Sequence, residues 1–146
     1  MAALLSSLLA VAQQKVFVME IRDEIDPRMS RYVELALEAA REQQADYVVI
    51  DMDTYGGAVN DADDIRSRLL EFEKPVFTFI NKNAASAGAL ISIATDSIYM
   101  QKGSSIGAAT VVSGADGSQA PDKYQSYMRS MMRSTAEAHG RGYGRR

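Results

Sequence analysis

The sequence predicts an α/β domain with a mainly parallel sheet and flanking helices, and two observations lead to that fold class. Short runs rich in β-branched and aromatic residues alternate with stretches whose apolar residues recur at helical spacing. The run at residues 47–52 is apolar almost throughout, which is typical of a strand covered on both faces. Strands that alternate with helices imply βαβ units, whose crossovers are right-handed in nearly every case.

The strands and helices are expected in alternation along the chain. The strands are predicted at residues 16–21, 47–52, 76–80 and 97–100. The first helix opens at Asp26-Pro27, because Pro suits the first helical position, and it runs to about Gln43. The second covers residues 59–69, before Pro75, and residues 84–94 are small and apolar enough for a buried third helix.

The remainder of the chain is predicted to hold a long loop and a last helix. Residues 103–120 are rich in Gly, Ser and Ala and are expected to be loop, after which Pro121 leads the last helix. One face of that helix is expected to carry Tyr124, Tyr127, Met128, Met131 and Thr135. The methionines there, Met132 included, are interpreted as core filling rather than as a cofactor contact.

The composition excludes several classes of function. The 146 residues suit one domain, and a formal net charge of −3 without a dominant basic patch argues against nucleic acid as a partner. The chain has no cysteine and a single histidine, His139, so it offers neither thiolate catalysis nor the His ligands of a zinc hydrolase. No metal or other cofactor is expected, and no run reaches the ~20 apolar residues of a membrane-spanning helix.

The two ends of the chain differ from the middle. Residues 2–12 are apolar or small, and Ala10-Val11-Ala12 before Gln13 fits the cleavage pattern of a secretory signal, although no Lys or Arg precedes them. Residues 1–14 are therefore interpreted as a signal peptide remnant or a disordered lead. Residues 15–141 form the predicted domain, and residues 142–146 form a basic, Gly-rich tail.

Two segments are expected at the carboxyl ends of strands, where parallel sheets gather their sites. In residues 53–58, Gly56 and Gly57 permit close backbone approach, and their N–H groups at a helix start could face a developing oxyanion. A plain strand-to-helix turn explains the same glycines. In residues 83–89, small neighbours could hold the Ser86 hydroxyl exposed at a tight turn, as in a nucleophile elbow. A helix N-cap explains the same serine.

A nucleophilic serine needs a base, and the chain offers two candidates. His139 is followed by Gly140 near the end of the last helix, where it is interpreted as a cap. A lysine must be neutral to act as a base, which burial and the positive end of a helix dipole favour. Lys123 is the best placed, at the start of the last helix beside Tyr124, although an exposed surface lysine is the ordinary alternative.

A further group of carboxylates, Asp61, Asp63 and Asp64, lies at the predicted start of the second helix. Negative charge complements the helix dipole there, so a solvated helix start is preferred over a metal site.

The ordered series of motifs resembles the Clp-protease/crotonase superfamily and, more narrowly, the NfeD-type proteases, which are membrane-bound relatives of signal peptide peptidase A. The resemblance covers residues 15–141 and implies the ββα-superhelix of that superfamily. The matching segments follow the opening strand: residues 51–57, 81–89, 103–109, 122–123 and 136–141.

The resemblance implies a serine endopeptidase with Ser86 as nucleophile and Lys123 as general base. Gly57 and Ala87 would supply the oxyanion-hole N–H groups, and Gly56 would shape the turn. It also implies no cofactor, hydrophobic substrates such as apolar segments of stomatin-like membrane proteins, a homodimer or higher oligomer, and an extracytoplasmic (periplasmic) place at the membrane for the full-length form. Tyr55 stands where the family usually has Pro, and the chain ends early, as if truncated.

Two other functions remain open at this point. A crotonase relative that handles acyl-CoA would share the fold and the use of Gly-Gly in an oxyanion hole, but it would not need both Ser86 and Lys123. A catalytically silent, truncated protease fold would only bind apolar peptides or a partner, and the shortened end favours it.

Overall fold

The computed structural model of the chain describes residues 13–140. The predicted signal segment lies outside that range except for its last two residues, and the predicted basic tail lies wholly outside it.

A parallel sheet forms the frame of the structure, as predicted. Its strands run in the order β1 (Val16–Ile21), β2 (Tyr47–Thr54), β3 (Val76–Ala85) and β4 (Ser97–Met100), and the short β5 (Ser105–Gly107) also pairs with β3. All these pairings are parallel. The carboxyl ends of β2 and β3 therefore lie side by side at one edge of the sheet.

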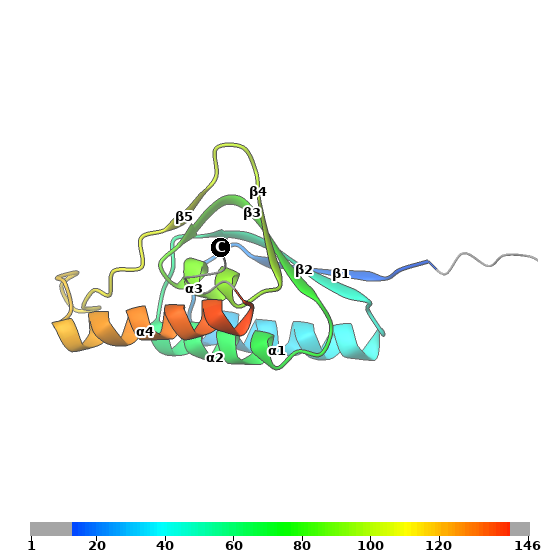
Figure 1. The fold of residues 1–146 in the computed structure, drawn as a ribbon, viewed down its shortest axis with the longest axis horizontal. Coiled ribbons are helices and arrows are strands. Elements are labelled where there is room, and N and C mark those ends of the chain that lie inside the picture. Colours follow the sequence, from blue (N-terminus) through cyan, green and yellow to red (C-terminus); the bar gives the residue numbers. More distant parts are fainter. Residues whose placement is uncertain (1–12, 141–146) are drawn as a thin grey trace, which may run out of the picture.

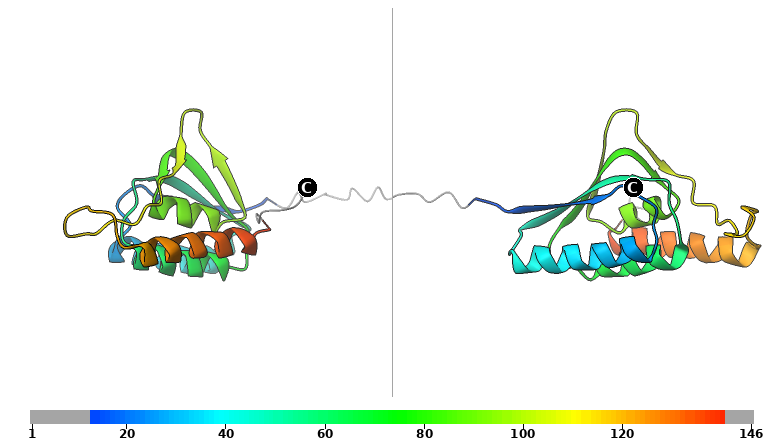
Figure 2. Two further views of the ribbon diagram at one scale, coloured as in Figure 1. Left: turned by 60° about the vertical axis from the view of Figure 1, so that its left-hand side comes forward. Right: turned by 180° about the vertical axis from the view of Figure 1, so that it is seen from behind.

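The helices cover one face of this sheet. They are α1 (Pro27–Glu42), α2 (Val59–Leu70), α3 (Ala87–Ile93) and α4 (Asp122–Ala138). The views in Figures 1 and 2 place all of them on the same side, with α3 between the sheet and the other helices. Asp26 caps α1 as its sequence suggested, since its side chain accepts a hydrogen bond from the Met29 N–H at 2.9 Å.

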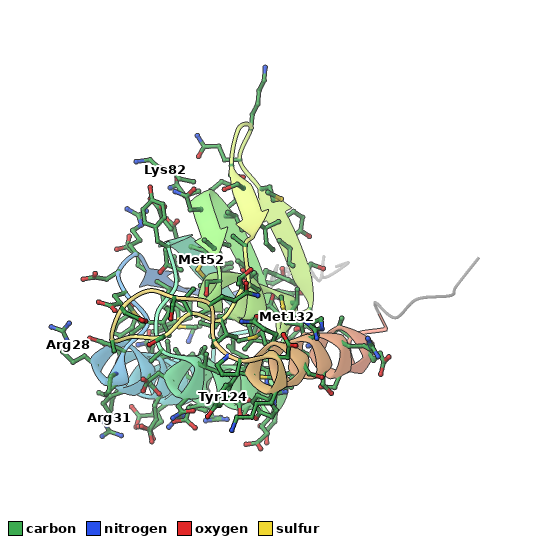
Figure 3. The ribbon with its side chains drawn as sticks, turned by 90° about the vertical axis from the view of Figure 1, so that its left-hand side faces the viewer. Arg28, Arg31, Met52, Lys82, Tyr124 and Met132 are labelled. Atoms are coloured by element: carbon green, nitrogen blue, oxygen red, sulfur yellow. The ribbon has the colours of Figure 1, made fainter. Side chains whose placement is uncertain are left out.

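The core lies between the sheet and these helices. Alternate side chains of β2 are fully buried there, including Ile50 and Met52, and Met52 lies in the interior in Figure 3. The prediction that β2 is covered on both faces is wrong, because no described helix packs on its other face. On that face Tyr47, Phe77 and Tyr99 shield one another, with ring centroids 5.7 Å and 6.2 Å apart along the row.

Two predicted boundaries were wrong at the place where the sheet approaches α3. Strand β3 does not end at Ile80 but continues to Ala85, and α3 begins at Ala87 rather than at residue 84. The extension exists because Ala84 pairs with Thr54 of β2 and residues 83–85 pair with β5. Strand β5 itself lies inside the segment predicted to be loop.

Helix α4 packs through a face slightly different from the predicted one. Met128, Met131 and Thr135 are buried as predicted, but Tyr124 and Tyr127 are 49% and 56% exposed. Gln125 is buried instead, because its amide binds backbone groups of the preceding loop. Figure 3 shows Tyr124 on the outer side of the helix.

Candidate active site

The two segments singled out in the sequence meet at the edge where β2 and β3 end. Thr54 is the last residue of β2 and pairs with Ala84 of β3, so the glycines after Thr54 lie beside the turn after Ala85. A Cβ atom built on Gly56 would lie 2.7 Å from the Ser86 Cβ and 3.2 Å from the Ala87 nitrogen. The structure thus brings Gly56, Ser86 and Ala87 into direct contact.

Ser86 occupies a strained backbone conformation. Its φ of +52° and ψ of −113° lie outside the regions that residues with a Cβ ordinarily adopt. The Ser86 N–H donates to the Gly107 carbonyl of β5 at 2.7 Å, which fixes the turn between β3 and α3. Such strain costs on the order of 1–3 kcal/mol and clusters at functional sites.

The Ser86 side chain does not do what a simple N-cap does. Ser86 is the residue before α3, but its hydroxyl makes no capping hydrogen bond, and no other described residue binds it. Its carbonyl, by contrast, accepts the Ala89 and Leu90 N–H groups at 3.0 and 3.3 Å. The half-buried hydroxyl is therefore left unpaired at the tight turn.

Two backbone N–H groups beside Ser86 also lack partners among the described residues: those of Gly57 and Ala87. Gly57 pairs with Ile25, but that pairing uses the Ile25 N–H to the Gly56 carbonyl at 2.9 Å and the Ala58 N–H to the Ile25 carbonyl at 2.7 Å. Ala87 lies in the first turn of α3, where N–H groups have no acceptor within the helix. Ala87 directly follows Ser86 in the chain, and Gly57 directly follows Gly56, which contacts Ser86.

Thr54 holds the glycine turn in place, and sequence analysis assigned it no role. Its buried hydroxyl donates to the Asp23 carbonyl at 2.7 Å and accepts the Gly56 N–H at 3.1 Å. Its methyl group packs so closely on α3 that a Cβ on Gly88 would come within 2.6 Å of it. A hydroxyl-bearing, β-branched residue two positions before Gly-Gly was the available signal.

A cavity of about 510 Å³ opens beside the glycine turn. Its walls are Arg22, Asp23, Glu24, Asp53, Thr54, Tyr55, Gly56 and Gly57. Arg22 forms an ion pair with Asp51, and that pairing raises the pKa of the guanidinium. Asp53 accepts hydrogen bonds from the Asn83 N–H and side-chain amide, both at 3.2 Å, so its carboxylate ties β2 to β3.

Lys123 lies apart from this group. It belongs to the first turn of α4, where its side chain is exposed and its Nζ lies 4.9 Å from the centroid of the Tyr124 ring. No hydrogen bond joins it to Ser86 among the described residues. The start of α4 and the loop before it extend beyond α3 in Figure 1 and in both views of Figure 2.

The remaining candidates have structural contacts. His139 ends α4, as predicted, and its Nε2 lies 2.9 Å from the Ala94 carbonyl at the far end of α3 from Ser86. Asp63 forms an ion pair with Arg66 at 2.8 Å. Within residues 13–140 no group of three or more His, Asp or Glu side chains is arranged to hold a metal ion, and no helix there is long and apolar enough to cross a membrane.

The chain resembles membrane-associated relatives in sequence. The profile of the family described as NfeD1b, N-terminal domain, matches residues 15–144. The membrane protein NfeD1b of Bacillus subtilis is 34% identical over 88% of this chain. The membrane-bound protease PH1510 of Pyrococcus horikoshii is 29% identical over 90% of it. The chain spans about a third of these relatives, 29% and 31% of their respective lengths.

Solved structures agree with the predicted fold. Two mutants of the 1510-N membrane-bound stomatin-specific protease, one serine-to-alanine and one lysine-to-alanine in complex with a substrate peptide, each match with a TM-score of 0.81. They are 25% and 27% identical, and each match covers 87% of this chain and 65% and 61% of the relative. ClpP1 from Listeria monocytogenes, 22% identical, matches with a TM-score of 0.68 over 86% of this chain and 74% of its own, which confirms the ClpP-like fold alone. The chain belongs to the NfeD1b N-terminal domain family.

Proposed function

We propose that this chain is the catalytic domain of a serine endopeptidase in which Ser86 is the nucleophile and Lys123 the general base. One observation carries the proposal. The Ser86 hydroxyl is unpaired at a strained turn that directly contacts Gly56, and the N–H groups of the next residues, Gly57 and Ala87, have no partner among the described residues. A nucleophile next to two unpaired donors is the arrangement that acyl transfer requires.

The reaction would proceed in two steps. The Ser86 Oγ attacks the carbonyl carbon of a peptide bond while its proton passes to the neutral Lys123 amine. The N–H groups of Gly57 and Ala87 stabilise the oxyanion, and the C–N bond breaks as Lys123 returns the proton to the leaving amine. Water then attacks the acyl ester, its proton passes through Lys123 to the Ser86 Oγ, and the acid product leaves.

The proposal includes movement of Lys123 toward Ser86 when substrate binds. Catalytic hydrogen bonds are often absent in a substrate-free enzyme and form only in the complex, so an exposed Lys123 does not exclude the role. Lysine-to-alanine and serine-to-alanine mutants of the stomatin-specific relative, one of them bound to a substrate peptide, support the same pair of residue types.

We propose apolar peptide segments, such as those of stomatin-like membrane proteins, as the substrates. Two exposed apolar side chains border the residues around Ser86: Tyr55, 83% exposed, precedes Gly56, and Ile106, 40% exposed, precedes Gly107. The relatives described as a membrane-bound protease and as a membrane-bound stomatin-specific protease support stomatin-like substrates and membrane association. An extracytoplasmic location, a signal peptide and assembly into a homodimer or higher oligomer belong to the same proposal.

Cleavage of an apolar peptide library would test this function. Ser86→Ala and Lys123→Ala should each lose activity by roughly 10³-fold or more, as members of one catalytic unit do. Lys82→Ala is the matched control, because Lys82 is exposed on β3 and should be dispensable.

A silent, peptide-binding fold is the second candidate, and the exposed position of Lys123 favours it. A folded wild type that binds apolar peptides but cleaves none between pH 6 and 10 would establish that candidate and refute the peptidase.

A further inference from the structure

A buried glutamine ties the start of α4 to the loop that leads into it. Gln125 is only 7% exposed, although most glutamines lie at the surface. Its Oε1 accepts the Val111 N–H at 3.0 Å, and its Nε2 donates to the carbonyls of Val111 at 2.6 Å and Ala120 at 3.2 Å. The side-chain amide is thus fully used in binding backbone groups.

Those backbone groups close the base of a small hairpin formed by residues 111–120. The Ala120 N–H donates to the Val111 carbonyl at 2.9 Å, and Val112 pairs with Gln119 in antiparallel fashion. Three of the four hydrogen bonds named at the hairpin base therefore come from Gln125. They fix the first turn of α4 against the 111–120 hairpin.

The first residue of this hairpin, Val111, is joined through a short segment to β5, which binds the proposed nucleophile Ser86. Val111 follows Gly107 by four residues, and the Gly107 carbonyl binds the Ser86 N–H at 2.7 Å. Four extended residues span at most about 14 Å, whereas the 16 residues from Gly107 to Lys123 could span about 55 Å. The hydrogen bonds from the Gln125 amide to Val111 and Ala120, here called the Gln125 clamp, tie the first turn of α4 to Val111. The clamp therefore limits how far that turn can move from Ser86.

We propose that Gln125 is a positioning residue for Lys123. This inference rests on the proposed Ser–Lys function. Lys123 precedes Gln125 by two residues in the same helical turn, so the clamp confines the region that the Lys123 amine searches. Confinement raises the effective concentration of the base near Ser86, and a misplacement of 1 Å can cost on the order of 10²-fold in rate. Gln125 itself touches no reacting atom.

The test compares Gln125→Met, Gln125→Glu and Gln119→Met with the wild type. Methionine keeps the length of the side chain but makes none of the hydrogen bonds, whereas glutamate can still accept the Val111 N–H. Gln119 is an exposed residue of the same hairpin, so Gln119→Met is a matched control. The measurements are kcat and KM for an apolar peptide across pH 7–10, and hydrogen exchange of residues 108–121.

We expect Gln125→Met to lower kcat by about 10- to 100-fold with KM changed less than about twofold, because the clamp acts on the base and not on peptide binding. Exchange across residues 108–121 should accelerate in the same variant. Gln125→Glu should recover part of both effects, and Gln119→Met should match the wild type. A kcat for Gln125→Met within twofold of the wild type, with exchange accelerated, would overturn the positioning role.

The two proposals can fail separately. An inactive wild type would remove the endopeptidase and with it any role of Gln125 in positioning a catalytic lysine. An active wild type whose kcat is insensitive to Gln125→Met and Gln125→Glu would remove the positioning role alone. If Gln125→Met does not fold, the same comparison is made with Gln125→Glu, where unchanged kcat again overturns the inference.

Discussion

The contact between Gly56 and Ser86 can be tested by adding a single methyl group. In Gly56→Ala, the new Cβ would lie 2.7 Å from the Ser86 Cβ and 3.1 Å from the Ala85 carbonyl oxygen. Carbon atoms pack best at about 3.5–4.0 Å, so the Ser86 turn must move. Alanine would also have to adopt the φ of +111° that glycine holds here.

The size of the effect follows from these two causes. The backbone conformation costs roughly 1–3 kcal/mol and the forced contact roughly another 1–3 kcal/mol. Gly103→Ala separates them, because Gly103 has a φ of +86° and open space around its Cβ position. The difference between the two variants, about 1–3 kcal/mol, measures the contact and corresponds to roughly 3–10 °C in Tm.

Thermal unfolding followed by circular dichroism and a peptide-cleavage assay give the two readouts. Gly56→Ala should unfold at a lower temperature than Gly103→Ala and should lose about 10²-fold in kcat/KM, because Ser86 and the Ala87 N–H are displaced together. If Gly56→Ala is no less stable than Gly103→Ala and has the same kcat/KM for peptide cleavage, then the Gly56–Ser86 contact does not support the site.

Three further experiments test other contacts of the structure. Gly57→Ala should destabilise more than Gly56→Ala in urea denaturation, since its Cβ would lie 2.1 Å from the Ile25 carbonyl oxygen and rigid backbone would have to move. Gly88→Ala should lose roughly 1–3 kcal/mol, and the double variant Thr54→Ser/Gly88→Ala should regain most of it, because serine removes the methyl group that the new Cβ would meet; no recovery would refute that packing. The pKa of Asp26 is lowered, and the largest cause is the hydrogen bond that its carboxylate accepts from the Met29 N–H. The stability that this carboxylate contributes is therefore present above the unfolded pKa of about 3.9 and is lost as pH falls through the lower folded pKa. The stability difference between wild type and Asp26→Ala, measured by urea denaturation at pH 7 and pH 2, should accordingly shrink at the lower pH.

The sequence predicted residues 47–52 of β2 and 76–80 of β3 but not the carboxyl ends of these strands, which build the site. Periodicity identified β2 and the start of β3, because those residues alternate or run apolar toward the core. Residues 81–85 of β3 are polar or small, and they form a strand only because β2 and β5 supply partners on both sides. Tertiary pairing of this kind leaves no local pattern, so β5 was also missed.

The candidate site divides in the same way. Local composition singled out Gly56, Gly57 and Ser86 as candidates, but a plain turn and a helix N-cap explained them equally, and only the family resemblance implied their roles. The clamp at Gln125 could not be predicted, since a glutamine between Tyr124 and Ser126 looks like an ordinary surface position. Its burial depends on the fold of the 111–120 hairpin, whose residues carry little hydrophobic pattern.

The two halves of the site can be separated by combining Gly56→Ala with Gln125→Met. Gly56 contacts the Ser86 turn, whereas Gln125 contacts the 111–120 hairpin, and the two have no contact partner in common. Losses in the free energy of unfolding should therefore add within about 0.5 kcal/mol. The loss in log kcat/KM of the double variant should be smaller than the sum of the two single losses, because a nucleophile and its base act as one unit and either defect disables both. Fully additive catalytic losses would mean that Gln125 acts on a step independent of Ser86, and Lys123 would then not be the base that Gln125 positions.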